Sequence, residues 1–158
     1  VFIASVALTR MLVLRWQRAG APALRNCLLL QLGLLLGGWA LGWLASPVTR
    51  PDAPLTLATG MACAAAMAVQ NAYGKLLMGR AAATTVMTGN VTQLVIELVD
   101  AVRGDGAALS RTATLLWPVL AFGAGAMCGA WAFVLAGFGG LLLPGALLLA
   151  LAVDARAE

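Results

Sequence analysis

Histidine is absent from the 158-residue chain, and charged side chains make up only 10% of it. Without histidine, Ser-His-Asp and Cys-His catalytic arrangements and histidine-ligated zinc sites are excluded. The three cysteines, Cys27, Cys63 and Cys128, lie in separate apolar runs without CxxC spacing. We interpret them as small packing residues, and we expect neither a cofactor nor a metal.

Apolar residues, in contrast, make up 62% of the chain, and its mean hydropathy is +0.94. A soluble domain is about half apolar and a quarter charged, so this composition excludes a soluble fold. Runs 26–46 and 112–136 hold no charge over the roughly 20 residues that cross about 30 Å of hydrocarbon as a helix. Lipid offers the backbone no hydrogen-bond partners, which favours helices. The sequence therefore predicts an all-α, polytopic protein whose main partner is the lipid bilayer.

About six apolar segments are expected to form one transmembrane helix bundle over residues 1–158: 1–14, 26–46, 55–74, 84–102, 112–136 and 138–153. The basic residues lie at the ends of these runs, where they set membrane orientation rather than bind nucleic acid. Arg15, Arg18 and Arg25 place the first connection in the cytoplasm, and Lys75 ends the third segment on the same side. This pattern indicates a multi-pass protein of a bacterial inner membrane.

The first segment is short for a membrane span and contains Arg10. It begins at Val1 rather than at methionine, and it lacks the basic leader of a signal peptide. We therefore expect a fragment without its N-terminal helices.

Glycines recur at helix-packing spacing, among them the pairs Gly33 with Gly37, Gly38 with Gly42, and Gly125 with Gly129. Small residues let helix backbones approach closely, which is a leading source of association in lipid. The pairs therefore predict close helix contacts, although glycine is also simply abundant in this chain.

The segment 84–102 gathers hydrogen-bonding side chains in an otherwise apolar chain. At 100° per residue, Asn90, Gln93, Glu97 and Asp100 share one helix face within an arc of about 80°. A carboxylate at the bilayer centre costs on the order of 3 kcal/mol, so this stripe is expected to line an interior. Glu97 is the candidate proton or cation site, unless it lies near the membrane interface.

Two further polar groups lie close to this stripe in the sequence. Thr88, Gly89 and Asn90 permit a helix to break or begin, and broken helices at membrane depth form the binding sites of transporters. Gln70 and Asn71 end the preceding apolar segment and can reach the stripe if the two segments pack together. These two amides can equally serve as hydrogen-bonding contacts between helices.

The stretch 60–94, "GMACAAAMAVQNAYGKLLMGRAAATTVMTGNVTQL", resembles the second half of the YoaK-like family of bacterial multi-spanning membrane proteins. Family members show a "GxQNA" helix, a short basic linker, and a "TGN" or "TGT" segment followed by "T-x-L". Ala68 and Val69 precede Gln70 here, which is a mild departure. The resemblance implies an inner-membrane protein built from two repeats, of which residues 55–153 are the second, and it implies no assigned function.

The orientation of the C-terminal half depends on whether 84–102 crosses the membrane or re-enters it. If it crosses, Arg103 and Arg111 lie outside. If it is re-entrant, both arginines and the C-terminus lie in the cytoplasm, which fits the positive-inside rule better. A re-entrant segment would also make the two family halves inverted repeats.

We interpret the chain as a transporter or channel-like protein for a small polar solute or ion. The expected ligands are Gln70, Asn71, Thr88, Gly89, Asn90, Gln93 and Glu97. The alternative is an assembly protein whose polar residues only join helices, and a homo-oligomer is compatible with both. An enzyme is disfavoured, because Glu97 and Asp100 lie on one helix and not on converging elements.

Overall fold

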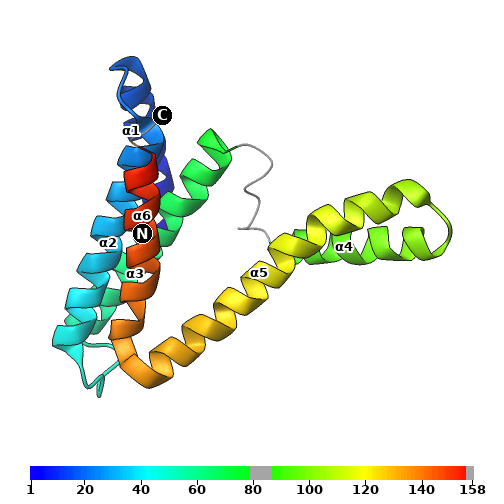
Figure 1. Ribbon diagram of the computed structural model, residues 1–158. Helices are drawn as coiled ribbons and strands as arrows, with labels where there is room; N and C mark the ends of the chain where they lie inside the picture. The colour runs from blue at the N-terminus through cyan, green and yellow to red at the C-terminus, as the bar shows by residue number, and fades with distance from the viewer. Residues whose placement is uncertain (79–86, 156–158) are drawn as a thin grey trace. The chain divides into compact units, whose positions relative to one another are not determined.

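In the computed structural model, residues 1–78 and 87–155 are described, and every regular element among them is helical (Figure 1). This confirms the prediction of an all-α fold. The elements are α1 (Phe2–Arg18), α2 (Ala23–Ala45), α3 (Pro54–Leu77), α4 (Met87–Val102), α5 (Gly106–Ala136), the 3-10 helix η2 (Gly137–Leu141) and α6 (Leu142–Asp154).

Three helical stretches in the described part of the chain are long and apolar enough to cross a membrane. They are α2, α3 and the stretch Gly106–Asp154, which comprises α5, η2 and α6. The prediction of six apolar segments is not confirmed, because α1, α4 and α6 are only 17, 16 and 13 residues long. The structure therefore supports a membrane protein with three candidate spans, but it does not confirm the predicted number of segments.

Several of the predicted segment boundaries differ from those of the helices, and two of these differences concern charged residues. α1 continues through Arg10 and Arg15 to Arg18, so the basic residues expected in a connection lie on the helix. α5 begins at Gly106 instead of 112, because the Asp105 carboxylate accepts the Ala107 backbone N–H at 2.9 Å and caps the helix. Gly104, at φ +102°, makes the turn between α4 and α5.

The chain forms two compact units, which are described separately. The first unit comprises Val1–Met78 and Ala132–Glu158. In it, α2 packs against both α3 and α6, and α1 packs against α3. The core consists of Val13, Cys27, Leu28, Leu35, Val69, Tyr73, Leu148 and Ala152.

Glycines allow the closest contacts of the first unit. A Cβ atom on Gly38 would lie 2.9 Å from Cys63 Sγ, and one on Gly42 would overlap the Phe138 ring of η2. The predicted close approach at Gly38 and Gly42 is therefore confirmed. Among the described residues, nothing lies within 4 Å of such an atom on Gly33 or Gly125, so no close contact is found at these two positions.

The second unit, Gly79–Trp131, contains α4 and most of α5, which run side by side as a hairpin (Figure 1). α4 begins at Met87, so Thr88, Gly89 and Asn90 lie in its first turn, and within the described residues the helix is not interrupted at Gly89. Residues 79–86 lie outside the description. Large apolar side chains such as Val95, Trp117 and Met127 are exposed, which is consistent with contact to a lipid bilayer.

Candidate functional site

A polar cluster lies between α2 and α3 in the first unit, and it consists of the buried residues Gln31 and Tyr73 and the half-buried Gln70. The Tyr73 hydroxyl donates a hydrogen bond to Gln31 Oε1 at 2.9 Å, and Gln31 Nε2 donates to Gln70 Oε1 at 3.3 Å. Gln31 and Tyr73 are 5% and 7% exposed. We call these three residues the glutamine cluster.

The position of each member follows from helix geometry. Gln70 and Tyr73 are three residues apart on α3 and therefore share the face that meets α2. Gln31 lies eight residues after Ala23, about 12 Å along α2, and Gln70 lies seven before Leu77, about 10 Å from the end of α3. If α2 and α3 cross the membrane, the cluster lies well inside the hydrocarbon.

One buried acceptor of α3 is unsatisfied. Asn71 Oδ1 is buried and has no hydrogen-bond partner in the described part of the chain. A buried polar atom without a partner is uncommon, and water or a ligand is its usual explanation. Asn71 is thus a candidate contact for a polar solute, as its place in the sequence predicts.

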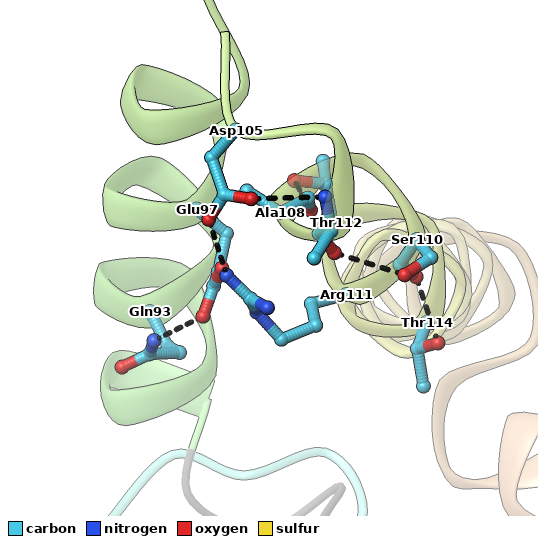
Figure 2. Close-up of polar contacts among 9 residues, drawn as sticks. Gln93, Glu97, Asp105, Ala108, Ser110, Arg111, Thr112 and Thr114 are labelled. Atoms are coloured by element: carbon cyan, nitrogen blue, oxygen red, sulfur yellow. Dashed lines mark hydrogen bonds and ion pairs between the residues drawn. The ribbon is translucent and has the colours of Figure 1, made fainter. Parts of the chain in front are cut away.

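A second polar cluster lies in the second unit, where Arg111 of α5 reaches across to α4 (Figure 2). Its Nε lies 2.7 Å from Glu97 Oε2, and its Nη2 lies 3.0 Å from Asp105 Oδ2. Gln93 Nε2 donates to the other Glu97 oxygen, also at 2.7 Å. We call Gln93, Glu97, Asp105 and Arg111 the ion-pair cluster.

The ion-pair cluster differs in exposure from one end to the other. Glu97 is 8% exposed, whereas the Arg111 and Asp105 side chains are 48% exposed. Glu97 and Arg111 each lie five residues from the end of their helix at the turn, about 7.5 Å along it. Both Glu97 oxygens have partners, so the carboxylate serves here as a link between α4 and α5.

The turn itself carries one shifted carboxyl group. The Ala107 backbone N–H, and after it the Arg111 guanidinium, lower the pKa of Asp105 below its ordinary value of 3.8. Both groups donate to the ionised carboxylate and so favour it. Nearby hydroxyl groups are occupied within the helix, since those of Ser110, Thr112 and Thr114 donate to carbonyls of α5 (Figure 2).

The residues predicted from the sequence divide between the two units. Gln70 and Asn71 belong to the first unit, and Gly89, Asn90, Gln93 and Glu97 belong to the second. Gln93 donates a hydrogen bond to Glu97, as members of one predicted set. Gln70 accepts a hydrogen bond from Gln31, which was not predicted. Asn90 is half-buried and Gly89 is exposed, while the Thr88 side chain lies outside the description.

Sequence reasoning missed Gln31, Tyr73 and Arg111. Gln31 is the one amide in the run 27–45, and Tyr73 is the one tyrosine in the chain, three residues after Gln70. These are weak but readable signals, because an isolated polar side chain in an apolar helix needs a partner. Arg111 lies outside the predicted segments 84–102 and 112–136, and only the hairpin brings it beside Glu97.

Comparison with known proteins gives one match. The model of a family described as "Protein of unknown function (DUF1275)" covers residues 1–153. No curated protein and no solved structure matches the chain. The resemblance to the YoaK-like family is not confirmed by this match and stays an expectation.

Proposed function

The chain belongs to the DUF1275 family, a membrane-protein family without an assigned function, and we propose that it moves a small polar solute or ion across a membrane. The observation that carries the proposal is the glutamine cluster, because it places amide and hydroxyl groups inside a unit of apolar helices. Polar groups away from water cost free energy unless they are paired. Pockets for small molecules use a few such groups in an otherwise apolar wall.

Asn71, the residue after Gln70 on α3, offers a further polar group to a solute. Its unsatisfied Oδ1 can accept a hydrogen bond from a solute without breaking any bond of the resting structure. Residues of the second unit complete the proposed set of ligands, and they are Thr88, Gly89, Asn90, Gln93 and Glu97. Glu97 would then act on the solute or a coupling ion only after it parts from Arg111.

The proposed membrane topology follows from contacts within the first unit. Phe138 of η2 meets Gly42 near the end of α2, while Asp154 at the end of α6 lines a cavity together with Leu24 near the start of α2. α6 therefore runs antiparallel to α2. The basic residues at the start of α2 and Lys75 assign this end to the cytoplasm.

We propose that α4 is re-entrant, because Arg103 and Arg111 then lie on the cytoplasmic side, as the positive-inside rule favours. The predicted segment 84–102 would then enter and leave the membrane on one side, as discontinuous helices of transporters do. The proposal also includes two inverted repeats, of which 55–153 is the second. It further includes a homo-oligomer and a location in a bacterial inner membrane.

Uptake into proteoliposomes tests the proposal with Asn71→Leu. Radiolabelled amino acids, polyamines and quaternary ammonium ions form the panel of solutes. We expect Asn71→Leu to abolish uptake at unchanged thermal stability, since its Oδ1 has no partner to lose. Asn26→Leu, a half-buried asparagine near the start of α2, is the matched control and should transport normally.

An assembly role is the second candidate, because both polar groups of Gln31 already have partners within the bundle. A protein of that kind takes up no solute at all, and its polar residues affect only stability. Neither proposal includes a chemical conversion. Absence of uptake for the whole panel, in vesicles shown to contain folded protein, would overturn the transport proposal.

A further inference from the structure

A cavity of about 240 Å³ opens at one end of the first unit, where α2 begins and where α3 and α6 end. Its volume is below the range of roughly 300–1,000 Å³ that is typical for drug-sized ligands, so it suits a smaller solute. The cavity is lined by Leu24, Leu28, Tyr73, Met78, Leu151, Asp154 and Ala155.

The wall of this cavity combines three chemical features. Leucine, methionine and alanine side chains make most of it apolar, Tyr73 adds an aromatic ring, and Asp154 adds a carboxylate at its exposed rim. Within residues 1–78 and 87–155, Asp154 takes part in no ion pair. Among the described residues that line the cavity, none is lysine or arginine. A carboxylate and an aromatic ring both attract a cation, and the apolar wall accepts alkyl groups.

Tyr73 connects the cavity with the buried polar groups. Its side chain lines the cavity, and its hydroxyl donates to Gln31 in the glutamine cluster. Tyr73 therefore lies between a solute in the cavity and Gln31, and Gln31 in turn contacts Gln70. This arrangement is what a vestibule on the way to an inner polar site requires.

We infer that this cavity binds a small organic ammonium ion, whose charge pairs with Asp154 and whose alkyl groups contact the Tyr73 ring and the leucine wall. The inference rests on the proposed function, since it names the class of solute that would be carried. The cavity lies at the end of the unit that the basic residues assign to the cytoplasm. It would therefore hold the ion on the inner face of the membrane.

Isothermal titration calorimetry on the protein in lipid nanodiscs tests the inference with choline as the probe. The control ligand is 3,3-dimethylbutanol, in which carbon replaces the quaternary nitrogen, so that it has the same shape without the charge. We expect saturable binding of choline and none of the alcohol. Equal binding of the two compounds, or no saturable binding of choline, would overturn the inference.

Four substitutions locate the bound ion. Asp154→Asn should weaken choline binding about fivefold, as expected for one exposed ion pair, whereas Asp52→Asn, in the loop at the opposite end of α2, should leave it unchanged. Tyr73→Phe keeps the ring and should retain binding. Tyr73→Leu should weaken it about fivefold through loss of the cation–π contact. An Asp154→Asn protein that binds choline like the wild type would contradict the assignment, whatever the stability of the tyrosine variants.

Binding and uptake separate the two proposals. If choline binds but no solute of the panel is taken up, the ammonium site stands and the transport function fails. If other solutes are taken up while choline does not bind, transport stands and the ammonium site is wrong.

Discussion

The two polar clusters differ in charge as well as in depth. The glutamine cluster contains only neutral groups and lies about 10–12 Å along its helices, between α2 and α3. The ion-pair cluster contains three charged side chains and lies about 7.5 Å from the turn of its hairpin. Because burying a charge in lipid costs far more than burying a paired amide, charge is kept near a helix end and amides occupy the interior.

The two units also differ in how their helices pack. In the first unit α2 has helices on more than one side, and glycines bring its backbone against its neighbours. In the second unit two helices form a hairpin whose large apolar side chains face outward. The first unit therefore depends on close fit, and the second depends on polar links across one interface.

Glycine substitution tests this difference with the largest expected effect. Gly42→Leu places a side chain where the Phe138 ring lies, so we expect a loss of about 3 kcal/mol in the free energy of unfolding or failure to fold. Gly37→Leu on the same helix and Gly125→Leu in the second unit meet nothing within 4 Å and should change stability little. Unfolding in mixed micelles measures all three, and equal losses would remove the proposed difference in packing.

Removal of Gln31 has the next largest effect. Gln31→Leu leaves the Tyr73 hydroxyl and the Gln70 carbonyl without their partner, at a cost of about 1–3 kcal/mol. Adding Tyr73→Phe should recover part of that loss, because the unpaired hydroxyl is then absent. Gln17→Leu, an exposed glutamine on α1, is the control and should be nearly neutral. Strict additivity of the two core substitutions would show that the bond has no energetic value.

Breaking the ion-pair cluster should loosen only the hairpin. Glu97→Gln removes the charge that Arg111 contacts at 2.7 Å, so backbone amides of α4 should exchange with deuterium faster while those of α2 and α3 keep their rates. Asp100→Asn, a half-buried carboxyl group on the same helix, serves as the control. Unchanged exchange in Glu97→Gln would show that the pair does not hold α4 to α5.

Apolar runs and proline or glycine breakers sufficed to predict the helical fold and the spans α2 and α3. The beginning of α5 was missed because Gly106 to Arg111 is polar enough to look like a loop, whereas the Asp105 cap starts the helix there. The partner of Gln70 was missed for a different reason. Helical periodicity shows which residues share a face, but the face that meets α2 is decided by packing of the whole unit.

The smallest expected effect is a pH dependence of local stability at the turn between α4 and α5. The uncharged glutamine cluster should show no such dependence. Because the folded pKa of Asp105 is lowered, its contribution to stability is fully present above its ordinary pKa of 3.8 and is lost as pH falls through the lower folded value. Hydrogen exchange at the start of α5 should therefore increase, relative to the chemical exchange rate, as pH falls below about 4. Asp105→Asn should remove this response, while amides around Gln31 should show none in either protein. A response that survives in Asp105→Asn would show that another carboxyl group near the turn is responsible, and Glu97, the other carboxylate that Arg111 contacts, is then the next to replace.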